Sequence, residues 1–101
     1  MRQKVSKPQV LVAEDDRVVS LLIARSLEGV GAQITAVYDG LEALDVGLSG
    51  DFDLALLDQV MPGLLGAEVL QRWMDEGKAM PVIMISALTA EEDIARCLAL
   101  G

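Results

Sequence analysis

The chain has 101 residues, which suits one domain, and 52% of them are hydrophobic, which favours a folded globular protein over a disordered one. Its 16 acidic and 8 basic residues give a net charge of −8 without histidine, which disfavours nucleic acid and anionic membranes as direct partners. The single cysteine, Cys97, excludes an internal disulfide and fits a reducing cytoplasm. The first apolar run, Val10 to Ala13, is too short for a signal peptide, and no run approaches a membrane-spanning length, so we expect a soluble protein.

Four short apolar segments are typical of strands, and a helical pattern follows each of them. The expected strands are residues 9–13, 32–38, 54–58 and 82–86. The expected helices are residues 16–28, 39–50, 66–76 and a last one from Thr89 toward Gly101. No linker, repeat or low-complexity stretch interrupts the series. This alternation predicts an α/β fold with a parallel sheet, right-handed crossovers and helices on both faces.

Local signals mark the helix ends and one buried face. Asp39, with Glu42 three residues later, resembles a capping box that opens the second helix, and Gly77 ends the third. Four residues of the third helix recur at helical spacing and predict its buried stripe: Val69, Leu70, Trp73 and Met74.

Acidic side chains follow two of the expected strands at the point where each strand ends. Glu14, Asp15 and Asp16 follow the first strand, and Asp58 ends the third. In parallel sheets, ligands bind beyond the carboxyl ends of the strands, so these carboxylates share one rim if the two strands are neighbours. They would then repel one another and raise their pKa values, unless a hard divalent cation such as Mg²⁺ neutralises them. A simpler interpretation is an acidic first turn that favours the helix dipole, and it suits Asp16 best.

A carboxylate at a rigid strand end beside a metal ion is a positioned nucleophile. Asp58 could attack phosphorus to form an acyl phosphate, a reaction that depends on alignment and charge neutralisation. The hydroxyl of Ser86, at the end of the fourth strand, could hydrogen-bond a phosphoryl oxygen, and Ala87 would leave room for the group to enter. The simpler interpretations are that Asp58 is a turn residue before Pro62 and that Ser86 is a turn hydroxyl.

Three segments, VLVAEDD, LALLDQVMPG and VIMISA, occur in the order and spacing of a known family. Together they resemble the response-regulator receiver domain of two-component signalling, over nearly the whole chain from Val10 to Gly101. The resemblance implies a doubly wound, flavodoxin-like (CheY-like) fold with the strand order 2-1-3-4. Residues 1–101 would form a receiver domain with a short N-terminal tail, residues 1–8, and without the family's fifth strand and fifth helix.

The resemblance also implies roles for individual residues. Asp58 would accept a phosphoryl group from a sensor histidine kinase or a phosphotransfer protein, and Ser86 would be the switch hydroxyl. Mg²⁺ would be held by Asp15, Asp58 and the backbone carbonyl of Val60, with Glu14 acting largely through water. The domain would relay phosphorylation as a conformational signal in the cytoplasm. It would not be an enzyme beyond limited self-phosphorylation and self-dephosphorylation.

Some features depart from the family pattern. The lysine that pairs with the phosphoryl group has no counterpart before Gly101, and Leu65 stands where the family often has an acid. Val60 and Leu88 lie two residues after the phosphoacceptor and the switch hydroxyl, where receiver side chains flank the attacking water. Two apolar groups there predict slow self-dephosphorylation. An uncovered fourth strand predicts a sheet edge that could pair with a second copy of the chain.

Two other functions stay open. A receiver-like interaction module that does not signal by phosphate is favoured by the missing lysine and opposed by the intact acids. A Mg²⁺-dependent phosphatase or phosphotransferase of another aspartyl-nucleophile class usually carries a second acid two residues after the nucleophile. Here that position is Val60, which argues against such an enzyme.

Overall fold

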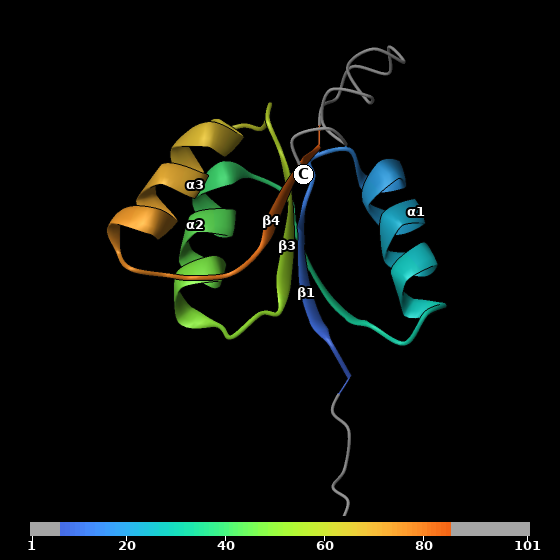
Figure 1. Ribbon diagram of the computed structural model, residues 1–101. Helices are drawn as coiled ribbons and strands as arrows, with labels where there is room; N and C mark the ends of the chain where they lie inside the picture. The colour runs from blue at the N-terminus through green and yellow to red at the C-terminus, as the bar shows by residue number, and fades with distance from the viewer. Residues whose placement is uncertain (1–6, 86–101) are drawn as a thin grey trace, which may run out of the picture.

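The computed structural model describes residues 7–85, in which four parallel strands form one sheet of order β2-β1-β3-β4 (Figure 1). The strands are β1 (Gln9–Ala13), β2 (Gln33–Val37), β3 (Leu54–Asp58) and β4 (Val82–Ile85). The helices are α1 (Arg17–Glu28), α2 (Gly40–Ser49) and α3 (Gly66–Asp75). The doubly wound sheet and its strand order are therefore confirmed. Ser86, Leu88 and the expected fourth helix with Cys97 lie outside the described residues.

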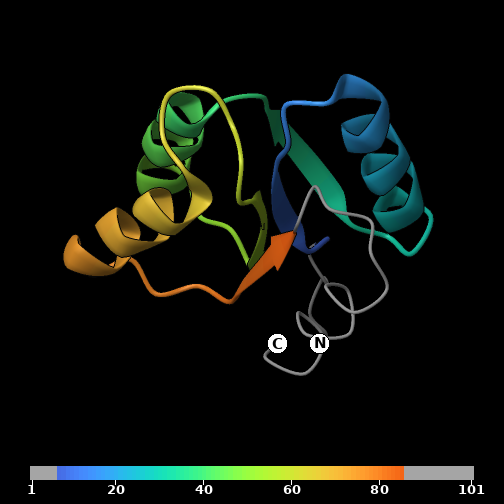
Figure 2. The same ribbon diagram turned by 90° about the horizontal axis from the view of Figure 1, so that it is seen from above.

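The sheet lies between two layers of helix. Helix α1 covers one face, and α2 and α3 lie together on the other (Figures 1 and 2). From β1 the chain moves to one side to form β2 and then crosses to the other side to form β3. The strand order thus reverses between β1 and β3, and the carboxyl ends of these two strands are adjacent, with Ala13 opposite Leu57. This is the place where doubly wound sheets bind their ligands.

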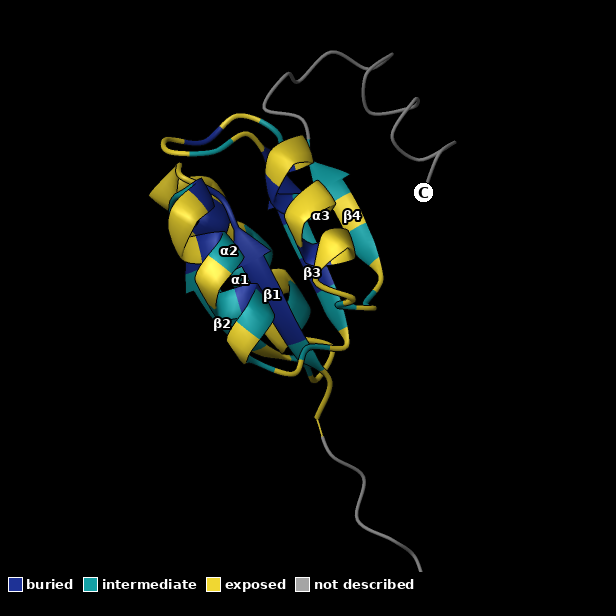
Figure 3. Ribbon diagram, turned by 90° about the vertical axis from the view of Figure 1, so that its left-hand side faces the viewer, coloured by how far each residue is buried: buried dark blue, intermediate teal, exposed yellow. Residues whose placement is uncertain are grey.

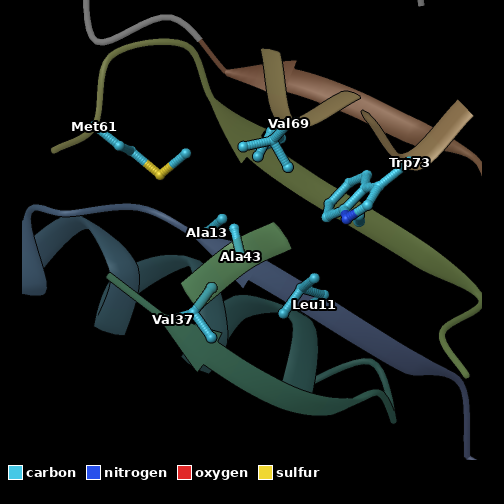
Figure 4. Close-up of a cluster of buried hydrophobic side chains, with 9 residues drawn as sticks. Leu11, Ala13, Val37, Ala43, Met61, Val69 and Trp73 are labelled. Carbon is cyan, nitrogen blue, oxygen red and sulfur yellow. The ribbon is translucent and has the colours of Figure 1, made fainter. Parts of the chain in front are cut away.

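Strand β1 lies in the centre of the molecule and is buried on both faces (Figure 3). Its apolar run without alternation is what a strand covered by helices on both sides requires. The main cluster of buried side chains fills the space between the sheet and the α2–α3 layer (Figure 4). Its members are Leu11, Ala13, Val37, Ala43, Ala55, Leu57, Met61, Val69 and Trp73.

Trp73 fixes α3 against α2. Its Nε1 donates a hydrogen bond to the Leu44 carbonyl oxygen at 3.3 Å, and Gly47 leaves no room for a Cβ beside the indole ring. Val69 and Trp73 are buried as the stripe predicted, but Met74 is 62% exposed, so the prediction for that residue is wrong. Met74 lies about 100° further round the helix than Trp73, which turns it away from the centre of the cluster.

The starts of α1 and α2 follow the local signals. Asp16 accepts from the backbone N–H groups of Val18 and Val19 at 2.9 and 3.2 Å, so it caps α1. Asp39 accepts from the N–H of Glu42 at 2.7 Å and caps α2 in the same way. No helix in the described part of the chain is long and apolar enough to cross a membrane.

Candidate functional site

Three carboxylates gather where β1 and β3 end. One oxygen from each of Glu14, Asp15 and Asp58 lies within 4.8 Å of the other two. Glu14 and Asp58 are 4% and 0% exposed, whereas Asp15 is exposed to solvent. The pairing of β1 with β3 produces this cluster, because the residues that follow both strands must meet at one edge. Three of the four residues predicted to hold a metal ion are thus brought together.

Asp16 does a different job from its two acidic neighbours. Its side chain caps α1, and its own backbone N–H donates to Glu14 Oε2 at 3.0 Å. The simpler interpretation, an acid that serves the start of a helix, therefore holds for Asp16. Its backbone also orients Glu14 within the cluster.

Asp58 is incompletely hydrogen-bonded. Its Oδ1 accepts from the backbone N–H of Val60 at 3.4 Å, which is a long bond. Its Oδ2 is buried and has no hydrogen-bond partner within residues 7–85. A buried carboxylate oxygen without a partner is costly, so the cluster favours either a proton or a cation at this position.

The buried acids hold their protons more tightly than usual. Burial, and then the charge of Asp58, raise the pKa of Glu14 from 4.5 to about 7, although the hydrogen bond from Asp16 opposes this change. Burial is also the main reason that the pKa of Asp58 is raised, and the hydrogen bond from Val60 opposes it. A bound cation would therefore favour the loss of the proton from both carboxyl groups.

No basic side chain neutralises the cluster within the described residues. The one ion pair found there joins Lys78 to Asp51 at 3.7 Å, and both residues lie at the opposite end of the sheet. Arg17, the basic residue nearest the acids in sequence, has its guanidinium carbon 3.8 Å from the centre of the Tyr38 ring, a cation–π contact. The cluster can therefore accept a cation from solution.

The sequence also predicts Val60 and Ser86 as site residues. The backbone N–H of Val60 donates to Asp58 Oδ1, and the Val60 side chain is 59% exposed. The role of the Val60 carbonyl as a metal ligand stays a prediction. Ile85, the last residue of β4, pairs with Asp58 across the sheet. Ser86 follows Ile85 in the sequence but lies outside the described residues.

Sequence reasoning missed Gln59, the residue after Asp58. Its N–H donates to the Ile85 carbonyl oxygen at 3.0 Å, and its own carbonyl oxygen accepts from Gly66 at 2.8 Å. Its side-chain Oε1 accepts from the N–H of Ala67 at 2.9 Å. No local signal reveals these contacts, because the partners lie on β4 and α3.

Comparisons with known proteins agree with this geometry. The family model for the response regulator receiver domain matches residues 10–101. The uncharacterized transcriptional regulatory protein YkoG of Bacillus subtilis is 33% identical over 97 residues, which cover 96% of this chain and 42% of YkoG. The transcriptional regulatory protein TctD of Salmonella typhimurium is 36% identical over 93 residues, which cover 92% of this chain and 42% of TctD. The chain thus spans less than half the length of these relatives.

Solved structures give the same result. The receiver domain of the Francisella response regulator 1452 superimposes with a TM-score of 0.79 at 34% identity, over 94% of this chain and 78% of that one. The response regulator TrrA of Thermotoga maritima, solved in complex with Mg²⁺ and BeF, gives a TM-score of 0.76 at 32% identity, over 81% and 71% of the two chains. The chain belongs to the response regulator receiver domain family of two-component signalling.

Proposed function

We propose that this domain is the phosphoacceptor switch of a larger response regulator and that Asp58 carries the phosphoryl group. The observation that supports this most directly is the state of Asp58. It is fully buried, it ends a rigid central strand, and one of its oxygens has no hydrogen-bond partner within residues 7–85. A structural aspartate at a turn would be exposed or fully hydrogen-bonded.

The donor set fits Mg²⁺. Glu14, Asp15 and Asp58 offer hard oxygen ligands close together, which suits a small divalent ion. The raised pKa of Glu14 and the buried Asp58 oxygen without a hydrogen-bond partner within residues 7–85 both favour a positive charge at this position. We propose that Asp15, Asp58 and the Val60 carbonyl bind the ion directly and that Glu14 acts largely through water. TrrA was solved with Mg²⁺ and BeF, and the receiver domain of the Pseudomonas aeruginosa sensor histidine kinase PA1611 was solved with Mg²⁺ in its active-site cleft, which supports this assignment.

The chain's own residues supply position and charge. Strand β3 holds the Asp58 carboxylate at the edge of the sheet, and the N–H of Val60 orients one of its oxygens. A carboxylate oxygen forms the bond to phosphorus while the bond between phosphorus and the histidine nitrogen of the donor breaks, and that nitrogen keeps the electron pair. Bound Mg²⁺ would neutralise the charge of the acids and of the incoming phosphoryl oxygens. Ser86 would be the switch hydroxyl that hydrogen-bonds the new phosphoryl group.

The donor would be a sensor histidine kinase or a phosphotransfer protein, and the setting would be the cytoplasm. The domain would act as a signalling switch rather than as an enzyme with an external substrate. Pairing of two copies along β4 stays a prediction. In its favour, Ile83 on this strand is 45% exposed, and β4 pairs on one side with β3 among the described residues.

Acetyl phosphate, a small phosphodonor, tests the proposal directly. The protein is incubated with acetyl phosphate and Mg²⁺, and intact mass spectrometry measures the gain of one phosphoryl group. We expect labelling of the unmodified chain, loss of labelling in Asp58→Asn, and unchanged labelling in the control Asp53→Asn, which alters the acid at the other end of the same strand. Absence of labelling in the unmodified chain, together with Mg²⁺ binding, would contradict the proposal and favour a phosphorylation-independent interaction module.

A further inference from the structure

Helix α3 begins without a side-chain cap of its own. The residue at its N-cap is Leu65, whose side chain has no acceptor atom. The first two N–H groups of the helix, those of Gly66 and Ala67, both donate to Gln59, one to its carbonyl oxygen at 2.8 Å and one to its Oε1 at 2.9 Å. The residue next to Asp58 in sequence therefore does the work of the missing cap.

Gln59 also joins this helix to the sheet. Its N–H donates to the carbonyl oxygen of Ile85 on β4 at 3.0 Å. Gly66 lies so close to the Asp58 carbonyl oxygen that it leaves no room for a Cβ, so the start of α3 packs directly on the end of β3. Gln59 is thus bonded at once to the end of β4 and to the start of α3.

These hydrogen bonds join both ends of the loop 60–65 to Gln59. The loop leaves Gln59 and returns to it at Gly66 and Ala67, and its first residue, Val60, contacts Asp58 through the long N–H bond of 3.4 Å. A loop held at both ends has little freedom to move its backbone away from the carboxylate. Without the side-chain bond from Ala67, Gln59 would hold the start of α3 only through the backbone bond from Gly66.

We propose that Gln59 is a positioning residue for the cation site. Its amide group holds the backbone of Val60 against Asp58 but does not itself touch the cation or the phosphoryl group. This inference rests on the proposed function, because it concerns how well the same site binds Mg²⁺. Residues that orient ligands in this way change metal affinity by about ten- to a hundredfold when they are replaced, and we expect about tenfold here.

The structure offers a variant that separates helix capping from positioning. Leu65→Ser gives α3 its own cap, and Glu68, whose Oε1 already accepts from the N–H of residue 65 at 3.0 Å, completes a capping box. In Gln59→Ala/Leu65→Ser, the helix is capped again, but the bond between Gln59 and Ala67 is still missing. Thermal stability should recover in this double variant, and Mg²⁺ affinity should not.

The experiment uses the 101-residue chain and Mg²⁺ alone. Calorimetric titration gives the affinity, circular dichroism gives the melting temperature, and amide hydrogen exchange reports the loop. We expect Gln59→Ala to lower the melting temperature and to weaken Mg²⁺ binding about tenfold. In the double variant the start of α3 should regain its protection from exchange, while Val60 should still exchange faster than in the unmodified chain.

Gln71→Ala is the matched control. Gln71 is an exposed glutamine of α3 whose side chain donates to Asp75 at 3.0 Å, so its loss should leave Mg²⁺ affinity unchanged. Recovery of both stability and affinity in the double variant would show that Gln59 is only a cap and would overturn the inference. Unchanged affinity in Gln59→Ala would overturn it as well while leaving the proposed function intact. Failure of the unmodified chain to bind Mg²⁺ would overturn both.

Discussion

The two ends of β3 carry the same side chain in opposite situations. Asp53 lies just before the strand, is exposed, and accepts a hydrogen bond from the N–H of Gln9 at 2.8 Å. Asp58 is the last residue of the strand, is fully buried, and has one oxygen without a partner in the described part of the chain. The residue type is identical, so the surroundings decide what each carboxylate does.

The contrast extends to the two edges of the sheet. At the amino end, Lys78 donates to the Gly50 carbonyl oxygen at 2.6 Å and pairs with Asp51 at 3.7 Å. At the carboxyl end, among residues 7–85, the acidic cluster has no such cation. At the amino end a lysine thus compensates an acid, whereas the carboxylates at the carboxyl end have no compensating basic side chain among residues 7–85 and can bind a cation.

The largest expected effect is a loss of Mg²⁺ affinity when an acid at the carboxyl end of the sheet is replaced. Asp15→Asn removes one charged oxygen donor from the cluster, and we expect Mg²⁺ affinity to fall more than about tenfold. Asp51→Asn makes the same change at the amino end and should leave the affinity unchanged. Calorimetric titration of both variants measures the difference, and equal affinities would contradict the assignment of the site.

The next effect concerns stability, and its sign should differ between the two ends. In metal-free protein at pH 8, Asp58→Asn removes a buried charge from a repelling cluster, so the free energy of unfolding should rise by about 1 kcal/mol. Asp53→Asn replaces a charged acceptor by a neutral one and should lower it by about 0.5 kcal/mol. Urea denaturation tests this pair, and a loss of stability in both variants would show that Asp58 is a structural residue.

The pH dependence sharpens the comparison. Because the pKa of Glu14 is raised from 4.5 to about 7, the folded protein binds more protons than the unfolded chain between these values. The contribution of protonated Glu14 to the free energy of unfolding is therefore complete below pH 4.5 and is lost as the pH rises through 7. The raised pKa of Asp58 acts in the same direction. The loss should be on the order of 1–3 kcal/mol in metal-free protein.

Glu14→Gln tests this dependence. Urea denaturation at pH 5 and pH 7.5 should show a smaller difference in stability for the variant than for the unmodified chain. An equal difference in the two proteins would mean that other groups cause the pH dependence.

The last expected effect concerns the lifetime of the phosphoryl group. Val60 is 59% exposed beside Asp58 and offers the attacking water no hydrogen bond from its side chain. Val60→Asn should speed loss of phosphate by about three- to tenfold, because an amide can orient that water. Val30→Asn, at an 80% exposed position near the amino end of the sheet, is the control. Decay of labelled protein followed by mass spectrometry should be equal in Val30→Asn and the unmodified chain, and an equal rate in Val60→Asn would refute the prediction.

The sequence determined the elements within residues 7–85 and the identity of the acidic cluster. Apolar runs marked β1 and β3 at the residues where the structure has them, and Asp39 marked the start of α2. Glu14, Asp15 and Asp58 could be grouped from the order of residues along the chain. That order was sufficient because the carboxyl ends of parallel neighbouring strands must meet at one edge of the sheet.

The tertiary structure decided what those residues experience. It showed that Asp58 keeps an oxygen without a partner in the described part of the chain and that Asp53 accepts a hydrogen bond from Gln9. It also showed that Gln59 caps a helix that begins seven residues later, at Gly66, and that Met74 turns toward solvent. Periodicity and capping signals report only on neighbours within a turn or two, whereas burial and hydrogen bonding depend on segments that are distant in sequence and meet only when the sheet and helices pack.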